Sequence, residues 1–436
     1  MVIKAGQLVQ VEISTTCGNI TSISASDTIK SLVASFNKTL IFDSNSILKK
    51  LQSNLDSLTS TPLLQPHQKL TVINQFIGPT LIYPLQTCRL DSIPKNFLNK
   101  ADNMIRSAVK QILQLASDTP NSMFYSSYKH KGLSVLKTKW NAFLQQININ
   151  KTLQSINKPH INHTRDFENI TTKCLEELKL DPSMRDVKVR KLRQHLRDKE
   201  FAEWCSYPHK GKGVKLFSEV PSANKWVRNK QNLSSSEWRD MLKMVAMVPP
   251  LRSIPGRSTN TSHCRHCGVY ESLPHVLGSC PQGELLRIKR HNIVRTLLAN
   301  SLRSKGLEVY EEVHCLADGD SNRRIDIIAI NRQKASADIV DPTIRFEVSL
   351  NQPNEVDLEK KKIYEPSIPY FLEKYNLKKI SVTGLFFGSR GTISKFFVTW
   401  RNKYKIEKSV QEEIIFTVIK YSVAILRNHL YGLNSC

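Results

Sequence analysis

A cluster of cysteine and histidine residues beyond the middle of the chain has the types and spacing of a metal site. The pattern Cys-x2-Cys-x7-His-x4-Cys is formed by Cys264, Cys267, His275 and Cys280. A structural zinc ion takes four thiolate or imidazole ligands arranged as a tetrahedron. The spacing therefore predicts a structural zinc knuckle. Two alternatives stay open: the cysteines bind no metal, or the adjacent His263 or His266 replaces one ligand.

Two aspartates that follow the knuckle are placed symmetrically about a predicted turn. Asp326 and Asp341 are equally far from a turn centred between Gln333 and Lys334. If the flanking strands pair as a hairpin in that register, the two carboxylates lie directly opposite, with Cβ atoms about 4.5 to 5.5 Å apart. Like charges at that distance repel unless a cation lies between them. The pair therefore predicts a Mg²⁺ site that activates water for phosphodiester cleavage.

A lysine on the next helix could complete this site. Lys360 and Tyr364 are four residues apart and share a helix face. A lysine ammonium there could orient the attacking water or stabilise charge on the phosphate. The alternatives are a solvated lysine run and, for the aspartates, exposed carboxylates at a sheet edge. Pro342 favours the edge, because proline cannot donate a ladder hydrogen bond.

The charge of the chain indicates a polyanionic partner. The 63 lysines and arginines outnumber the 38 acidic residues, for a net charge of +25. Such an excess favours nucleic acid. A basic helix predicted from Met184 to Glu200 carries candidate phosphate contacts at Arg190, Lys191 and Arg193. A solvated basic face is an equally good interpretation of that helix.

Membrane and disulfide-rich classes are disfavoured. An apolar run of about 18 residues, the length that spans a bilayer, is absent, and the best candidate is interrupted by Lys420. No signal peptide is recognised, and the nine cysteines are an odd number. We therefore expect a reducing compartment, no membrane and no small-molecule substrate.

The elements that must position these residues divide into two kinds. Helices are predicted in the N-terminal half over Ile29–Leu58, Gln68–Ile82, Lys100–Leu115 and Gly132–Gln146. Their simplest interpretation is a helical support domain. Three tryptophans are expected as core anchors rather than base-stacking platforms: Trp204, Trp226 and Trp238.

The C-terminal part predicts an α/β domain with a mixed sheet. The expected order is a helix, three strands, a helix, a strand and a helical end, over Gly283–Ser304, Leu307–Val313, Arg324–Ile330, Asp338–Ser349, Glu355–Tyr375, Lys379–Phe387 and Thr392–Leu430. The fold class is therefore α+β multidomain.

These motifs together resemble the C-terminal part of a non-LTR retrotransposon polyprotein of the insect kind with a restriction-like endonuclease. The resemblance is carried by the knuckle spacing and by Arg290-His291-Asn292, Arg324-Ile325-Asp326, the segment Asp341 to Glu347, and Glu359-Lys360 with Tyr364. Ile325 stands where proline is usual, and Ser349 where ordinary restriction enzymes have lysine. Upstream, Ile105 to Lys110 and Lys131-Gly132-Leu133 resemble a reverse-transcriptase thumb.

The resemblance implies four segments: a palm end and thumb remnant over 1–150, a basic helical linker over 151–257, a CCHC zinc knuckle over 258–283, and a restriction-like endonuclease domain over 284–436. It implies that Asp326 and Asp341 bind Mg²⁺ while Lys360 acts on water or phosphate, with help from Glu347. Nucleic-acid contacts are expected from Arg265, Arg290 and His291.

The implied protein is a truncated retroelement product that nicks target DNA, with target DNA and element RNA as partners and the nucleus as its place of action. No Asp-Asp pair occurs in the chain, so no polymerase activity is expected. The alternative is a catalytically inactive nucleic-acid-binding remnant. A purely helical interaction protein would require a metal-free knuckle.

Overall fold

The structure is a computed structural model that describes short strand segments between residues 2 and 36, and then residues 43–87, 93–156, 167–257, 260–317 and 321–432. The chain divides into two compact units. The first comprises residues 1–114 and 135–198, and the second comprises residues 115–134 and 199–436. The roles given to the four expected segments stay predictions, because this division does not test them.

The first unit begins with three short antiparallel hairpins. They are formed by β1 (Val2–Lys4) with β2 (Gln7–Val9), β3 (Glu12–Thr15) with β4 (Gly18–Thr21), and β5 (Ile29–Ser31) with β6 (Ala34–Phe36). The helix predicted from Ile29 is therefore wrong over its first part. Helix α1 (Ser44–Ser60) begins only after Asp43, whose carboxylate accepts a hydrogen bond from the Ser46 N–H.

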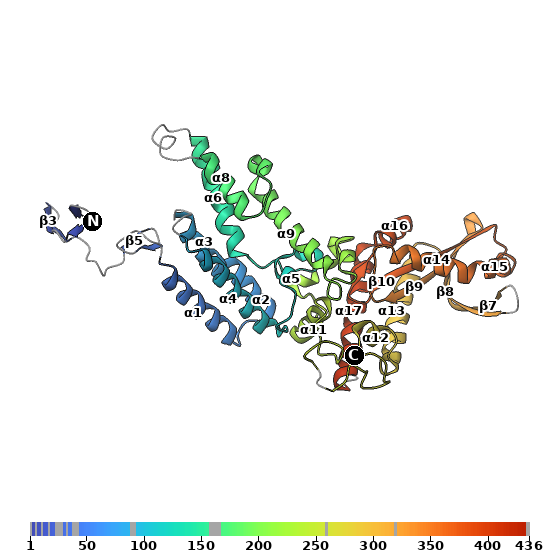
Figure 1. Cartoon of the computed structure of the whole chain (residues 1–436). Coiled ribbons are helices and arrows are strands. Elements are labelled where there is room, and N and C mark those ends of the chain that lie inside the picture. The colour runs from blue at the N-terminus through green and yellow to red at the C-terminus, as the bar shows by residue number, and fades with distance from the viewer. Residues whose placement is uncertain are drawn as a thin grey trace. The chain divides into compact units, whose positions relative to one another are not determined.

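The helices of the first unit pack by their buried apolar faces (Figure 1). They are α2 (Pro66–Val72), a π-helical turn (Ile73–Ile77), α3 (Gly78–Thr87), α4 (Lys95–Leu113), α6 (Thr138–Ile156) and α8 (Phe167–Glu177). The helix predicted from Gly132 begins six residues late, at Thr138. The reason is a distant cap, because the Asp102 carboxylate of α4 accepts hydrogen bonds from the Thr138 and Lys139 N–H groups.

The basic helix predicted from Met184 is present as α9 (Val189–Ser206), which is preceded by a short 3-10 helix (Pro182–Asp186). The helices after it in the second unit are short: α10 (Trp226–Asn229), α11 (Ser235–Val245) and α12 (Leu273–Gly278), with α5 (Asn121–Tyr125) from the earlier segment. The expectation that three tryptophans anchor the core is confirmed, because each is no more than 1% exposed: Trp204, Trp226 and Trp238.

A mixed sheet forms the centre of the second unit, as predicted, but it has five strands instead of the expected four, because Thr392–Ile393 at the start of the predicted last helix pairs as a strand. Its strand order is β11-β10-β9-β8-β7. The strands are β7 (Glu308–Ala317), β8 (Ser321–Asn331), β9 (Ser336–Arg345), β10 (Lys379–Gly388) and β11 (Thr392–Ile393). The β9–β10 pair is parallel and the other pairs are antiparallel. A parallel pair needs a crossover, which α14 (Gln352–Tyr364) and α15 (Ile368–Tyr375) supply.

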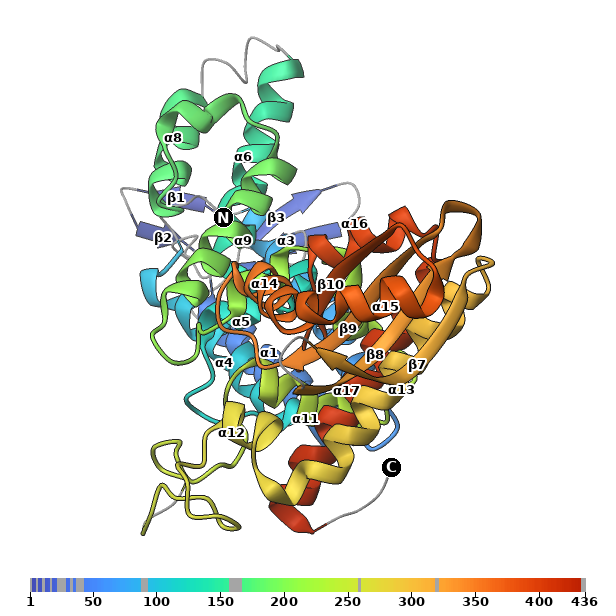
Figure 2. The ribbon, with the colours of Figure 1, turned by 90° about the vertical axis from the view of Figure 1, so that its right-hand side faces the viewer.

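Helices cover the sheet and complete its core (Figure 2). Tyr364 and Phe371 pack with Ile328, Ile330 and Ile339 in one buried cluster. The long helix α13 (Glu284–Arg303) packs against β7, β8 and β9 and against the last helix, α17 (Lys408–Tyr431), while α16 (Lys395–Lys403) packs on β10. None of the helices in the described part of the chain has the length and apolar character that crossing a membrane requires.

Candidate metal centres and nucleic-acid contacts

The four predicted knuckle ligands come together in the structure. The Cys264 Sγ lies 3.7 Å from the Cys280 Sγ, and the Cys267 Sγ lies 3.2 Å from the His275 Nε2. All four ligand atoms lie within 4.8 Å of one another. Local structure sets this geometry, since His275 is in the first turn of α12, where its N–H donates to the capping Ser272 hydroxyl. A Cys3His cluster of this size can bind zinc.

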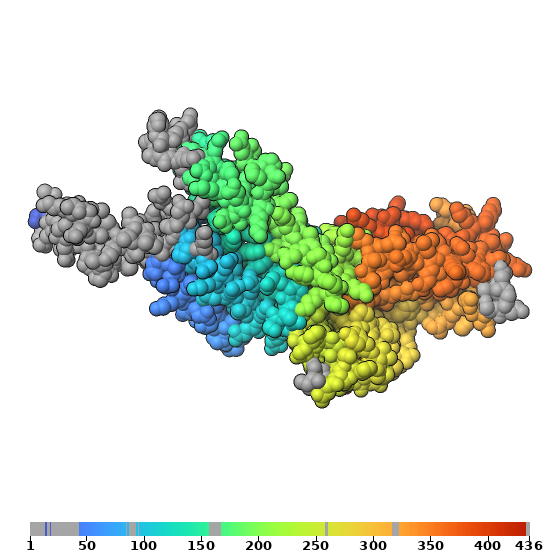
Figure 3. Space-filling model, viewed as in Figure 1, coloured from blue at the N-terminus to red at the C-terminus, as the bar shows by residue number. Residues whose placement is uncertain are grey.

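The two histidines beside the ligands are engaged elsewhere. The His263 Nδ1 lies 2.9 Å from the Thr261 hydroxyl, and the His266 Nε2 lies 2.8 Å from the His429 carbonyl oxygen. Neither replaces a ligand in the Cys3His cluster. In the space-filling view, the residues around the knuckle, coloured yellow, form a lobe beside the orange and red residues of the sheet (Figure 3).

A histidine that the sequence did not point to supports the knuckle from the last helix. The His429 Nδ1 lies 3.6 Å from the Cys280 Sγ, and its Nε2 lies 2.9 Å from a Glu271 carboxylate oxygen. Burial alone would raise the pKa of Glu271, but hydrogen bonds from Arg265, the Arg252 N–H and His429 hold it at about 2. Metal ligands are commonly oriented by such outer partners. A local spacing pattern could not reveal His429, because 149 residues separate it from Cys280.

Two arginines expected to contact nucleic acid make their contacts inside the protein. The Arg265 Nε lies 2.8 Å from Glu271, in the pair that fixes this acidic residue. Arg290 is 2% exposed and donates to the Ser422 hydroxyl and the Leu277 carbonyl. Burial lowers the pKa of Arg290 to about 9. Arg290 is therefore a core residue, and its place in the pattern reflects packing between α13 and α17.

The predicted hairpin register of the two aspartates is confirmed. Ile327 pairs with Val340 and Ile328 with Ile339, so Asp326 and Asp341 occupy the next position in the same register. The predicted turn is a 3-10 helix over Arg332–Lys334. The ladder between β8 and β9 stops at the Ile327–Val340 pair.

The edge alternative is wrong. β9 is a central strand between β8 and β10, and Asp341 is 3% exposed. Pro342 is tolerated there because it lies just beyond the end of the β8–β9 ladder, where no hydrogen bond to β8 is required.

Asp341 is surrounded by three donors. Its Oδ2 accepts from the Tyr364 hydroxyl at 2.8 Å and lies 2.9 Å from the Lys360 Nζ, while its Oδ1 accepts from the Thr343 hydroxyl at 2.9 Å. One turn of α14 separates Lys360 and Tyr364, so the helix delivers both to the same carboxylate. Burial, followed by the Asp341 charge, raises the pKa of Tyr364. The phenol therefore stays a hydrogen-bond donor at neutral pH.

Asp326 has a different neighbour. Its Oδ2 lies 3.3 Å from the His291 Nε2 on α13, and its side chain is 14% exposed. His291 was expected to contact nucleic acid, and the structure brings it to a carboxylate instead. The group Asp326, Asp341, Lys360, Tyr364 and His291 is called the aspartate cluster below.

Glu347 lies in a separate group and does not join the aspartates through any contact among the described residues. Its carboxylate accepts hydrogen bonds from the Arg390 N–H at 3.0 Å and the Arg390 Nε at 3.1 Å. The Lys131 Nζ donates to the Arg390 carbonyl at 2.6 Å and to Thr392 at 2.8 Å. Lys131, Glu347 and Arg390 are all 0% exposed. We call these three residues the buried ion cluster.

Burial lowers the pKa of Lys131 to about 7. The packing around Glu347 is tight, since a Cβ at Gly388 would lie 2.3 Å from the Glu347 Oε1. Neither Glu347 nor Lys131 has room for a ligand.

The candidate phosphate contacts of the basic helix differ among themselves. Arg190 and Lys191 are exposed. Arg193 is half-buried, and its Nη2 lies 3.2 Å from the Asn141 amide oxygen. The structure therefore leaves the first two available to a partner and gives the third a structural contact.

Comparison with known proteins gives one consistent result. No protein-family model matches the chain. A Retrovirus-related Pol polyprotein from the type-1 retrotransposable element R2 of Popillia japonica is 28% identical over 256 residues, which are 58% of this chain and 34% of that protein. A second protein of the same description from that beetle is 26% identical over 78% of this chain and 69% of its own length.

A further relative comes from Nasonia vitripennis. Its Pol polyprotein from the type-1 element R2 is 22% identical over 81% of this chain and 32% of its own length. The chain thus spans about a third of the length of two of these relatives. The resemblance seen in the sequence motifs is confirmed: over most of its length this chain is related to the Pol polyproteins of non-LTR retrotransposable elements.

Proposed function

We propose that this retroelement protein is a metal-dependent DNA endonuclease of the restriction-like type, which nicks target DNA at the aspartate cluster. The observation that supports this most is the contact of Lys360 and Tyr364 with Asp341, next to Asp326 in the hairpin register. Two carboxylates and a lysine are the groups that metal-assisted hydrolysis of a phosphodiester requires.

The carboxylates fit a hard divalent cation such as Mg²⁺. An ionised carboxylate has about four lone-pair positions, and Asp341 uses three of them for Thr343, Tyr364 and Lys360. Asp326 contacts His291 through Oδ2 only, among the described residues, which leaves its Oδ1 for a ligand. Oxygen donors of this kind are those that Mg²⁺ prefers. When bound, Mg²⁺ would polarise a phosphate oxygen and lower the pKa of a water molecule.

The chain's own groups have separate roles in this proposal. Lys360 is the counter-ion of Asp341, and its ammonium would hold a phosphate oxygen or the attacking water once Asp341 had another cation as its partner. Tyr364 fixes the orientation of the Asp341 carboxylate. His291 does the same for Asp326, because its Nε2 lies 3.3 Å from the Asp326 Oδ2.

The knuckle and the basic surface complete the proposal. Zinc at the Cys3His cluster stabilises the lobe beside the sheet. Nucleic acid binds through exposed basic side chains such as Arg190 and Lys191. Target DNA and element RNA are the proposed partners, and the nucleus is the proposed place of action. The lack of polymerase activity stays a prediction from the missing Asp-Asp pair.

A catalytically inactive nucleic-acid-binding protein is the second candidate. The observation in its favour is that Asp341 is 3% exposed and already paired with Lys360. If that ion pair persists in the presence of Mg²⁺, the carboxylate holds no metal and no cleavage occurs.

Plasmid nicking distinguishes the two candidates. Purified protein is incubated with supercoiled DNA and Mg²⁺, and conversion to the relaxed form is followed for the wild type and for Asp326→Asn. The matched control is Glu373→Gln, which removes one negative charge from an exposed position on α15. We expect nicking by the wild type and the control, and a loss of at least about a hundredfold for Asp326→Asn.

DNA binding is measured on the same samples by fluorescence anisotropy. Equal nicking by the wild type and Asp326→Asn contradicts the endonuclease proposal. Binding without nicking in all three proteins favours the inactive candidate.

The zinc assignment has its own test. Elemental analysis of the wild type is expected to give one zinc per chain, with loss in Cys267→Ser. Cys205→Ser is the control, because Cys205 is a half-buried free cysteine outside the knuckle. A zinc content that is unchanged in Cys267→Ser, or zero in the wild type, removes the zinc from the proposal.

A further inference from the structure

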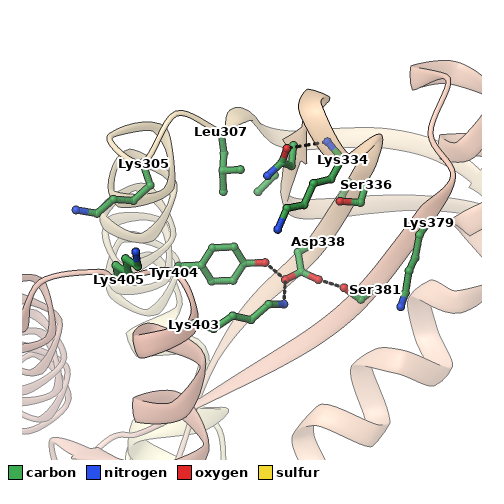
Figure 4. A pocket seen from close by; sticks show the side chains of 13 residues that line it. Lys305, Leu307, Lys334, Ser336, Asp338, Lys379, Ser381, Lys403, Tyr404 and Lys405 are labelled. Carbon is green, nitrogen blue, oxygen red and sulfur yellow. Dashed lines mark hydrogen bonds and ion pairs between the residues drawn. The ribbon is translucent and has the colours of Figure 1, made fainter.

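A pocket lined by lysines lies at the start of β9, away from both clusters described above. It has a volume of about 530 Å³. Five lysines line it together with one carboxylate: Lys305, Lys334, Lys379, Lys403, Lys405 and Asp338. The lysines come from the end of α13, the turn between β8 and β9, the start of β10 and the end of α16 (Figure 4). Four separate elements thus direct positive charge to one place.

The carboxylate of the pocket is already neutralised. Asp338 is 3% exposed, and its Oδ2 lies 2.9 Å from the Lys403 Nζ. The same carboxylate accepts hydrogen bonds from the Tyr404 and Ser381 hydroxyls (Figure 4). These contacts anchor the end of α16 to the sheet and hold Lys403 at the pocket.

The other four lysines have no compensating charge in the described part of the chain. All four are exposed, and no carboxylate pairs with any of them: Lys305, Lys334, Lys379 and Lys405. The positive charges around the pocket repel one another. Because the lining carries mainly positive charge, the electrostatic potential inside the pocket is strongly positive. Such a site attracts an anion with more than one charge.

We propose that this lysine pocket binds the phosphate groups of a nucleic-acid backbone, as a contact separate from the aspartate cluster. Only Ile339 and Val340 lie between Asp338 and Asp341 on β9, so the two aspartate side chains point to opposite faces of the sheet. The phosphates of a nucleic-acid strand that bind in the lysine pocket therefore do not fill the aspartate cluster. The pocket gives the domain a second grip on nucleic acid.

A backbone fits the pocket better than a small polyphosphate does. Flexible lysine stems on exposed positions follow a chain of phosphates without fixed geometry, because lysine acts as a point charge rather than a planar fork. A serine hydroxyl and an asparagine amide also line the pocket and can donate to sugar or phosphate oxygens: those of Ser336 and Asn331. Contacts of this kind set the position of a strand without reading its sequence.

A matched pair of neighbouring lysines gives the test. Lys379 lines the pocket, whereas Lys378 is exposed and does not line it. Lys379→Glu and Lys378→Glu change the net charge of the full-length protein equally. Binding of a fluorescent single-stranded RNA and of a DNA duplex, both of mixed sequence, is measured by anisotropy in Mg²⁺-free buffer over a range of salt concentrations.

We expect Lys379→Glu to weaken binding by roughly fivefold at about 0.1 M salt, and Lys378→Glu by less than about twofold. The reason is that each phosphate contact makes the binding constant up to about eightfold larger at 0.1 M than at 1 M salt. The double variant Lys334→Glu/Lys379→Glu is expected to lower the salt slope by one to two, about 0.9 per lost contact. If the affinity falls only for RNA, or only for DNA, that result identifies the nucleic acid that binds in the pocket.

A second measurement needs no variant. Acetylation of lysines in the wild type is compared with and without nucleic acid by mass spectrometry, and protection of Lys334 and Lys379 but not of Lys378 is expected. Equal affinities of Lys379→Glu and Lys378→Glu overturn the proposal, as does protection by inorganic tripolyphosphate but not by either nucleic acid. The Asp326→Asn variant keeps the pocket, so a failure of the endonuclease proposal is read separately.

Discussion

The aspartate cluster and the buried ion cluster hold carboxylates only six residues apart in the sequence, at Asp341 and Glu347. In the first cluster Lys360, which pairs with Asp341, has a side chain that is 16% exposed. Asp326 contacts His291 through Oδ2, and no contact of its Oδ1 is seen among the described residues. In the second, Glu347 and Arg390 are completely buried. In our proposal the first cluster exchanges its partner for a ligand, whereas the second keeps its ion pair.

The difference shows that the chemistry of a carboxylate depends on how tightly its partners are held. A buried pair whose hydrogen bonds are all made contributes to a single folded arrangement, and removal of one partner leaves an uncompensated charge. A pair with one partly exposed partner, such as Lys360, separates at a lower cost than a completely buried pair. The family resemblance implied that Glu347 assists catalysis, but its contacts with Arg390 are those of a structural residue.

The largest expected effect comes from breaking the buried ion cluster. Glu347→Gln leaves the Arg390 guanidinium buried without a counter-charge, and we expect a loss of about 3 to 5 kcal/mol in the free energy of unfolding. Urea unfolding followed by tryptophan fluorescence measures this loss, with Glu373→Gln as the surface control. A stable Glu347→Gln protein that has lost nicking would return Glu347 to the active site and break the comparison.

Asp341→Asn is expected to act on the other side of the comparison. Nicking of plasmid DNA should fall by at least about a hundredfold, because the amide cannot bind Mg²⁺ as a carboxylate does. The free energy of unfolding should fall less than for Glu347→Gln, since asparagine still accepts from Tyr364. If instead stability collapses while nicking per folded molecule is unchanged, the aspartate cluster is the structural one.

Lys360→Gln tests the counter-ion with its neighbour as a control. We expect nicking to fall by roughly ten- to a hundredfold, because a positive group next to the reacting phosphate is lost. The Lys361 Nζ pairs with Asp357 at 2.7 Å, so Lys361→Gln should leave the rate within about twofold. Similar losses in both variants would mean that the α14 lysines contribute only general attraction for DNA.

A further expected effect is a pH dependence of the buried ion cluster. The pKa of Lys131 is about 7 in the folded protein, lowered by burial from 10.5. Between these pH values the unfolded chain binds this proton more tightly than the folded chain, so the contribution of Lys131 to the free energy of unfolding rises with pH from about 7 to 10.

Unfolding of the wild type and Lys131→Met across this pH range measures the effect. The stability of the wild type relative to the variant should increase with pH. A difference that is constant, or that decreases, contradicts the assignment of a neutral Lys131 at high pH.

Much of the sheet domain could be predicted from the sequence because its determinants are local. The hairpin register follows from two apolar segments on either side of a polar turn, and the pairing of Ile327 with Val340 matches that prediction. The contact of Lys360 with Asp341 could be predicted because it depends on only two local features, one face of a helix and the end of one strand. The four knuckle ligands lie within a short segment and come together as their spacing indicated.

The structure departs from the local expectation where a distant residue decides the outcome. Asp102 determines where α6 begins, Arg390 determines the role of Glu347, and Glu271 engages Arg265. None of these partners is marked by spacing. Arg290 was expected to contact phosphate, because arginine side chains are usually exposed. The packing of α13 on α17 shows that Arg290 is buried instead.

The contact of His429 with Cys280 has a consequence for how the protein can be divided. The knuckle takes one of its supports from the last helix, and that helix also packs on α13 beside the sheet. A metal bound by the knuckle would therefore stabilise the whole second unit by mass action, and not only the knuckle segment. A fragment cut after Cys280 would lack the His429 imidazole that contacts this cysteine.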